Sequence, residues 1–420
     1  MKIIENDKVK EKVYIEKLDN GLTVMIIPKK NIRKKYIICG PNFGSIDNEF
    51  IIPGNTESTK LPDGVAHFLE HKMFEQRTGI NSLDTLTAIG VNANAYTTND
   101  HTAYLYEATD NFYEALDEYM DYIQNPYYTD ENVEKEKGII AQEINMYEDY
   151  PEWQVYLNAM KCMYKEMPVR LDIAGTVQSI SGITKEMLYD SYNNFYTPSN
   201  MAMCICGDFD PEEILEEIKK RITIKENKEA PTRIYPNEPD EIYEKEKEVN
   251  MELSNPMFAI GFKDKIEDNM VRKHIAVQTI ANTLFGESSK LYKELTDKNI
   301  LLGTLDAEYE FTKKYAHILI SGQSRNPREV IDRVNKEIEN AVKNGLNKED
   351  FLRNKKKLYG DFITEYNSVE NTARMFLSDY FKGINSFDYL EEYNSVTVEY
   401  AENILREVFN MNKEVISIVK

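Results

Sequence analysis

The chain has 420 residues, which is more than a single hydrophobic core usually supports, so more than one domain is expected. It carries 72 acidic and 51 basic residues, and the resulting net charge of −21 argues against a nucleic-acid partner, whose phosphates would be repelled. An acidic surface suits cationic or mixed peptides as ligands. A well-solvated surface without any partner explains the charge equally well.

Cysteine usage and hydropathy indicate the compartment. The four cysteines are too few and too scattered for a disulfide framework. Two of them, Cys204 and Cys206, lie in an apolar run that indicates a buried strand, so a core role is favoured over metal binding. The first residues lack the apolar core of a signal peptide, and no apolar run approaches the ~20 residues of a membrane span. We expect a cytoplasmic protein without membrane association.

Residues 8–60 are expected to form strands, beginning with a hairpin around Asp19-Asn20-Gly21. A loop rich in Pro, Gly, Ser and Thr follows over residues 50–63. Asp63 is the expected N-cap of the next helix.

That helix, over residues 65–74, carries the most informative motif of the chain. At 100° per residue His67, Glu70 and His71 share one face, while apolar residues cover most of the rest, so the helix is expected to be buried. Buried imidazoles and carboxylates need a partner, and a divalent metal would satisfy all three. The order His-x-x-Glu-His is the inverted zinc motif, in which the glutamate can accept a proton from water. The alternative is a helix with two structural histidines paired to Glu70.

A second helix over residues 82–90 and a strand pair over residues 92–106 are expected next. The first strand of the pair is polar, which indicates a sheet edge that could bind an extended peptide by strand addition. A solvent-facing hairpin is the alternative. His101 is expected at the surface and is not counted as a metal ligand.

The helix expected over residues 129–147 carries two glutamates near its apolar stripe. Glu136 and Glu143 are seven residues apart, which is two helical turns. Glu143 is the candidate for a third metal ligand, and Glu136 for a group that supports the ligands from behind. Semi-buried glutamates without a metal are the alternative.

Together, the motif helix and the Glu136–Glu143 helix resemble the pitrilysin-type metallopeptidases, a family that includes insulin-degrading enzyme and the mitochondrial processing peptidase. The resemblance runs in order over most of residues 15–215 and more weakly beyond. Further matching segments lie at residues 44–47, 94–97, 173–176, 192–201 and 207–210.

The resemblance implies a role for each motif residue. His67, His71 and Glu143 would bind one Zn²⁺ per chain, Glu70 would act as general base, and Glu136 would orient the ligands. The implied reaction is hydrolysis of a peptide bond without a covalent intermediate. Peptide substrates would bind along the strand that contains Asn94, Ala95 and Tyr96.

The family fold is α+β, with two similar sheet-plus-helix domains in tandem, as in the processing peptidases, and a clamshell dimer is expected. The zinc-bearing domain would span residues 1–222, a charged and solvated linker residues 223–248, and a metal-free homologous domain residues 249–420. In the second domain His274 and His317 are isolated and are expected to be packed or exposed.

One departure from the family concerns an Arg and a Tyr that the second part of the molecule supplies in single-chain and homodimeric members. Thr296 and Gly303 stand at the matching positions. This difference predicts a heterodimer with a paralogue that lacks the zinc motif and carries the Arg/Tyr pair. The chain would then be the catalytic subunit of a zinc endopeptidase that hydrolyses peptides or small unfolded polypeptides in an enclosed chamber. The alternatives are a self-sufficient homodimeric peptidase and a non-catalytic subunit that binds peptides or scaffolds a complex.

Overall fold

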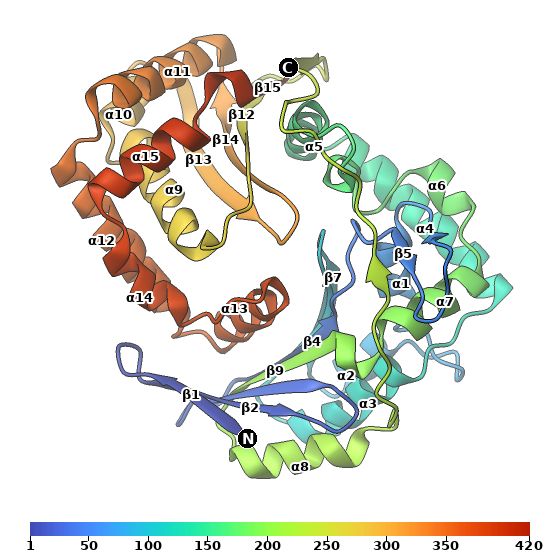
Figure 1. Ribbon diagram of the computed structural model, residues 1–420. Helices are drawn as coiled ribbons and strands as arrows, with labels where there is room; N and C mark the ends of the chain where they lie inside the picture. The colour runs from blue at the N-terminus through green and yellow to red at the C-terminus, as the bar shows by residue number, and fades with distance from the viewer. The chain divides into compact units, whose positions relative to one another are not determined.

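The structure is a computed structural model that describes all 420 residues, and its helices and strands form two compact units. Figure 1 shows the mixture of helices and sheets that confirms the expected α+β class. None of the helices is long and apolar enough to cross a membrane. Unit 1 consists of Met1–Ile144, Asp172–Tyr235 and Ile363–Ser386, and unit 2 of Asn145–Leu171, Pro236–Phe362 and Phe387–Lys420.

Unit 1 is built on a seven-stranded sheet of order β1-β2-β3-β9-β4-β8-β7. Only β3 and β9 run parallel, and the remaining pairs are antiparallel. The expected hairpin is the β2–β3 connection, and the polar strand β7 lies at the edge as expected. The strands are β1 (Lys2–Asn6), β2 (Glu11–Lys17), β3 (Thr23–Pro28), β4 (Lys35–Pro41), β7 (Asn92–Thr97), β8 (Thr102–Ala108) and β9 (Met201–Gly207).

Alternate residues of these strands face opposite sides of the sheet. Val24, Ile37 and Tyr104 belong to one hydrophobic core. Every helix of unit 1 except α13 contributes residues to this core. The opposite face carries α13, whose Tyr380 hydroxyl lies 2.8 Å from the Thr23 hydroxyl. The helices of unit 1 are α1 (Val65–Lys72), α2 (Ser82–Ala88), α3 (Phe112–Gln124), α4 (Asp130–Glu148), α6 (Val177–Ser181), α7 (Lys185–Phe195), α8 (Pro211–Arg221) and α13 (Val369–Lys382); a small sheet adds β5 (Glu49–Ile51), β6 (Thr59–Lys60) and β10 (Thr232–Arg233).

Unit 2 is built on a five-stranded sheet of order β11-β15-β12-β14-β13, in which only β11 and β15 are parallel. Its strands are β11 (Glu246–Val249), β12 (Met257–Asp264), β13 (Leu301–Phe311), β14 (Ala316–Ser324) and β15 (Glu414–Val419). Its helices are α5 (Pro151–Met163), α9 (Met270–Phe285), α10 (Lys290–Asp297), α11 (Pro327–Asn344), α12 (Lys348–Glu365), α14 (Asp388–Ser395) and α15 (Val398–Val408).

The two sheets share one topology. The order β3-β9-β4-β8-β7 in unit 1 corresponds strand by strand to β11-β15-β12-β14-β13 in unit 2. The parallel pair and the three antiparallel pairs also correspond. Helix α1 follows β4 in the chain before β7, just as α9 follows β12 before β13. The chain is therefore an internal duplication, and α9 is the counterpart of the motif helix.

Each sequence half of the chain contributes one helix that packs on the sheet formed mainly by the other half. Helix α5 comes from the first half and packs on β15 and β12, whereas α13 comes from the second half and packs on β9 and β4. These strands occupy corresponding positions in the two sheets. The exchange has the same symmetry as the internal duplication, because α5 and α13 cover equivalent surfaces of the two sheets.

The charged segment over residues 223–248 is anchored at Glu238. The Glu238 carboxylate accepts hydrogen bonds from the backbone N–H groups of residues 165–167 and from Lys263 Nζ. Burial would raise the pKa of Glu238, but these donors outweigh burial and lower it. Composition alone missed this anchor because it does not show which backbone groups need an acceptor.

Both isolated histidines of unit 2 are packed against aromatic residues, as expected. His274 Nδ1 lies 2.9 Å from the Tyr389 hydroxyl. His317 is 1% exposed, and its Nδ1 lies 3.0 Å from the Tyr164 hydroxyl. Burial lowers the pKa of His317, although the charge of Glu310 opposes the shift.

The lowered pKa makes His317 a source of acid sensitivity. Below pH ~6.5 the unfolded chain binds a proton that the folded chain resists, so the free energy of unfolding should fall by about 1.4 kcal/mol per pH unit until the folded-state pKa is reached. In His317→Gln this component should be missing. Urea unfolding between pH 7.5 and 5 measures it, and equal pH slopes in both proteins would contradict the assignment.

Candidate metal centre

The motif helix α1 is fixed at its N-terminus by a close backbone crossing. Its N-cap is Gly64, with φ of 95° and no side-chain cap. A Cβ atom on Gly64 would lie 2.4 Å from the carbonyl oxygen of Ala174, so glycine is required for space as well as for conformation. The prediction of Asp63 as the N-cap is wrong. The Asp63 carboxylate accepts a hydrogen bond from the side-chain amide of Asn48 instead of capping the helix. Backbone packing therefore sets the entry of this helix.

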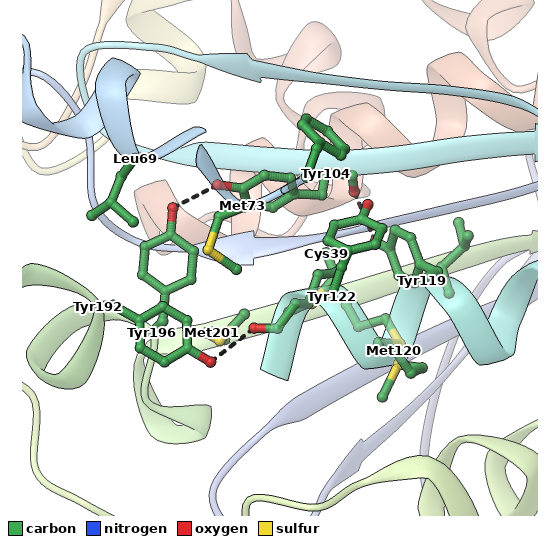
Figure 2. Packing of buried hydrophobic residues seen from close by; sticks show 14 of the residues in the cluster. Cys39, Leu69, Met73, Tyr104, Tyr119, Met120, Tyr122, Tyr192, Tyr196 and Met201 are labelled. Atoms are coloured by element: carbon green, nitrogen blue, oxygen red, sulfur yellow. Dashed lines mark hydrogen bonds between the residues drawn. The ribbon is translucent and has the colours of Figure 1, made fainter. Parts of the chain in front are cut away.

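Beneath α1 lies a cluster of buried tyrosines and methionines. Figure 2 shows Leu69 and Met73 in the same cluster as Tyr104 and Tyr196. The two phenol hydroxyls lie 2.8 Å apart, and the Tyr128 hydroxyl donates to Met73 Sδ at 3.0 Å. Since these three hydroxyls are hydrogen-bonded, their tyrosines can be buried against the helix at little cost.

Helix α4 presents the two glutamates to α1. Its residues Val133, Ile140 and Ile144 are buried in the core of unit 1. Glu136 and Glu143 project from the same side, and Glu136 is 6% exposed. The helical spacing recognised in the sequence therefore brings both carboxylates to the histidines.

Three side chains converge with metal-ligand geometry. His67, His71 and Glu143 each offer one atom, and these atoms all lie within 4.8 Å of one another. His67 Nε2 is 3.7 Å and His71 Nε2 is 3.4 Å from the Glu143 carboxylate oxygens. Ligands on a tetrahedral zinc ion stand about 3.3 Å apart, given bonds of ~2.0–2.1 Å. Two imidazoles and one carboxylate fit zinc in chemistry and in spacing.

The two histidines differ in electrostatic environment. Burial lowers the pKa of His67 to about 3, so this imidazole is neutral, the form that binds metal. For His71 burial acts in the same direction, but the hydrogen bond to Glu136 and the charges of Glu70 and Glu143 outweigh it and raise the pKa. The Nδ1 atom of His67 is buried without a hydrogen-bond partner, so packing alone orients that ring.

Glu136 supports His71 from behind. Its carboxylate lies 3.0 Å from His71 Nδ1, which leaves Nε2 directed at Glu143. On its other side lies Lys72, whose side chain is 0% exposed and whose Nζ is 3.5 Å from Glu136 and 2.7 Å from Glu75. Burial would raise the pKa of Glu136, but His71 and Lys72 together lower it. A buried cation thus holds the supporting carboxylate in its charged form.

Glu70 is held by the edge strand. The Thr97 hydroxyl of β7 donates to the Glu70 carboxylate at 2.6 Å. Burial raises the pKa of Glu70, and the hydrogen bond from Thr97 and the charge of His71 offset this only in part. A carboxylate with a raised pKa, positioned beside the ligand atoms, is suited to accept and return a proton.

Strand β7 has an edge free of strand partners. It pairs only with β8, and the backbone N–H of Ala95 donates to the side-chain carbonyl of Asn94 at 2.9 Å. Asn94 is exposed, while Ala95 and Tyr96 are half-buried. The Asn94 side chain therefore accepts the hydrogen bond of the Ala95 N–H, a backbone donor that an added strand would use.

Three further residues considered in the sequence analysis are His101 in unit 1 and Thr296 and Gly303 in unit 2. His101 is 3% exposed and contacts Asp100 and Thr98, so the expected surface position is wrong; its charged neighbour made burial possible. In unit 2 the Thr296 hydroxyl donates to the Tyr292 carbonyl within α10, and Gly303 adopts φ of 84° in β13.

Two residues of the centre were missed by sequence reasoning. Lys72 stands beside the motif in an otherwise apolar helix, and an isolated lysine in a buried helix signals a nearby anion. Thr97 follows Tyr96 in β7, and the alternation of side chains along a strand points it to the motif helix. Both signals were present, but neither residue belongs to the three-residue motif.

Comparison with known proteins agrees with this geometry. Residues 50–177 match the family model described as insulinase (peptidase family M16), and residues 182–358 match the M16 inactive domain. A Bacillus subtilis protein named as the uncharacterised zinc protease YmfH is 36% identical over 413 residues, which cover 97% of this chain and 96% of the relative. The probable mitochondrial-processing peptidase subunit beta of Arabidopsis thaliana is 28% identical over 220 residues, or 51% of this chain and 41% of that protein.

Among solved structures, an M16-like peptidase from Alicyclobacillus acidocaldarius superposes with a TM-score of 0.93 at 32% identity, covering 99% of both chains. The matched domains account for most of the chain. It therefore belongs to peptidase family M16, as the resemblance implied, and carries the two M16 domains in tandem.

The buried Lys72 yields a stability prediction. Lys72→Met should lower the free energy of unfolding by about 3 kcal/mol, because Glu136 would lose its buried counter-charge. The double variant Lys72→Met, Glu136→Gln should lose less than the sum of the two single variants. Urea unfolding of the four proteins measures the coupling, and Lys135→Met on the exposed side of α4 is the control. Strict additivity would show that the pair is not coupled.

Proposed function

We propose that this chain is a zinc-dependent endopeptidase with one Zn²⁺ bound by His67, His71 and Glu143. The observation that carries the proposal is the convergence of these three ligand atoms within 4.8 Å, with Glu70 beside them. The relatives named as zinc proteases support the choice of metal and of reaction. The expected cytoplasmic location stays a prediction.

The reaction assigns a separate task to each group. Zinc in such a site supplies a Lewis acid that polarises the scissile carbonyl and brings the pKa of water towards ~7. Glu70 accepts the proton of the attacking water and later delivers it to the leaving amine. Thr97 holds the Glu70 carboxylate in place, and Glu136 holds the His71 ring.

We further propose that the substrate binds as an extended strand beside β7. Asn94, Ala95 and Tyr96 would present their backbone to it, as edge strands do in strand addition. The substrate carbonyl would displace Asn94 from the Ala95 N–H. Because Thr97 on the same strand contacts Glu70, such binding would place a peptide bond beside the general base.

Replacing the general base tests the mechanism. Glu70→Gln should lower kcat by about 10²–10⁴-fold, since the amide cannot accept the proton, while zinc stays near one per chain. Cleavage of unstructured peptides and metal analysis measure the two effects. Glu57→Gln, an exposed loop variant, is the control. Full activity in Glu70→Gln would overturn the mechanism, and a chain that binds no zinc would favour the scaffold alternative.

A second chain would complete the site. Thr296 and Gly303 lack the charge and the phenol that the resemblance places there, so neither side chain can stabilise an oxyanion. One relative is named as a subunit, which supports a divided enzyme. We therefore propose a heterodimer with a paralogue that bears the Arg/Tyr pair, in which the two chains enclose a chamber for peptides.

Reconstitution tests the pairing. The chain alone should bind zinc but cleave peptides slowly, and adding the paralogue should raise kcat/KM by about 100-fold or more, as expected when an oxyanion donor is supplied. The matched control is the paralogue with its Arg and Tyr replaced. Full activity of this chain alone, as a homodimer by sedimentation, would overturn the heterodimer and leave the self-sufficient enzyme.

A further inference from the structure

Helix α13 places an arginine on the sheet of unit 1. The Arg374 side chain is 34% exposed, and its Nε donates to the Glu370 carboxylate at 2.9 Å. Its Cζ atom lies 4.9 Å from the ring centroid of Tyr96 and 5.9 Å from that of Tyr36. The guanidinium is thus held between one carboxylate and two aromatic rings, with part of it open to solvent.

The hydroxyls of these tyrosines surround the cation. Tyr36 is 1% exposed, and its buried hydroxyl has no hydrogen-bond partner of normal geometry. Burial raises the pKa of Tyr36 and of Tyr96, and Arg374 is the largest opposing influence on both. The guanidinium donates to Glu370 and lies beside two neutral phenols, and part of it remains open to solvent. A second carboxylate fits this open part.

This donor group lies at the strand proposed to bind the substrate. Tyr96 is the neighbour of Thr97, which contacts Glu70. Successive side chains of a strand face opposite sides, so Tyr96 and Arg374 stand on the α13 side of β7 while Thr97 faces α1. A strand added beside β7 would place alternate side chains on the same side as Tyr96, and the side chain directly opposite Tyr96 would lie about 5 Å away.

We propose that Arg374, together with the Tyr96 hydroxyl, forms a subsite that binds a carboxylate of the substrate close to the scissile bond. This inference rests on the proposed peptidase function and names its substrate class. The carboxylate is either an acidic side chain or a free C-terminus. A bidentate contact from the two terminal guanidinium nitrogens would select it over an uncharged amide of the same shape.

The subsite also explains why an arginine serves here. Lysine could neutralise Glu370 but offers no planar fork for a second carboxylate. In a chain with net charge −21, one cation at this edge marks the place where an acidic group is accepted rather than repelled.

Matched peptides provide the test. The zinc-loaded chain, with its paralogue where activity requires it, would be given peptides that differ only by Glu or Gln at each position around the cleaved bond, all with amidated C-termini. A second pair without acidic residues would differ only by a free or amidated C-terminus. We expect about tenfold or greater preference in kcat/KM for the carboxylate at one position or in the C-terminal pair, which identifies its source.

Variants of Arg374 separate recognition from structure. In Arg374→Gln the preference ratio should fall to near one, and in Arg374→Glu a lysine at that position should become the preferred residue. Arg353→Gln, an exposed arginine on α12, should keep the wild-type ratio. Thermal unfolding of each variant shows whether the helix remains docked, and a lost ratio with unchanged melting temperature supports recognition.

The same peptide pairs, labelled with a fluorophore, would be titrated by anisotropy into Glu70→Gln, which should bind without cleaving. Carboxylate-selective binding without any wild-type cleavage would contradict the peptidase function and support the subsite. Cleavage and binding that do not distinguish Glu from Gln, or acid from amide, would overturn the subsite and leave the peptidase function intact. A ratio unchanged in Arg374→Gln would overturn it as well.

Discussion

The centre of this protein depends on the desolvation of polar and charged groups within one short helix. His67, Glu70 and His71 lie in α1, which is packed on an aromatic cluster, and each would be unstable there without a partner. The structure supplies these partners one behind another. Glu143 faces both imidazoles, Glu136 supports His71, and the wholly buried Lys72 supports Glu136. The position of α4, the edge location of β7 and the backbone crossing at Gly64 all serve to keep these partners in reach.

Much of this arrangement could be predicted from residues alone. The three-residue motif and the seven-residue spacing of Glu136 and Glu143 set the candidate ligands, because helical geometry is nearly fixed. Strand order was less accessible: the polar composition of β7 indicated an edge and the run over residues 92–106 indicated its pairing with the next strand, but the position of β9 between β3 and β4 could only be seen in the fold. Lys72 and Thr97 were overlooked because their function comes from neighbours distant in sequence, namely Glu136 and Glu70.

The exchanged helices were beyond sequence reasoning for a related cause. Both α5 and α13 have apolar faces suited to a sheet, but nothing in a helix's own periodicity states which of two homologous sheets it covers. The corresponding strand orders of the units make the two sites equivalent, so the choice is made by connection length and by specific contacts. For α13 these contacts include the Thr23–Tyr380 hydroxyl pair and the bond from Lys29 Nζ to the Tyr366 carbonyl.

The exchange also has a consequence for biosynthesis. The sheet of unit 1 is complete once β9, which ends at Gly207, emerges from the ribosome. The helix that covers strands β4 and β9 ends at Lys382, which is 175 residues of synthesis later. Until then one apolar face of the nascent unit 1 sheet stays bare. Assembly of the motif-bearing half is therefore tied to completion of the other half. A prematurely terminated chain would expose this apolar face and would be prone to aggregation and proteolysis.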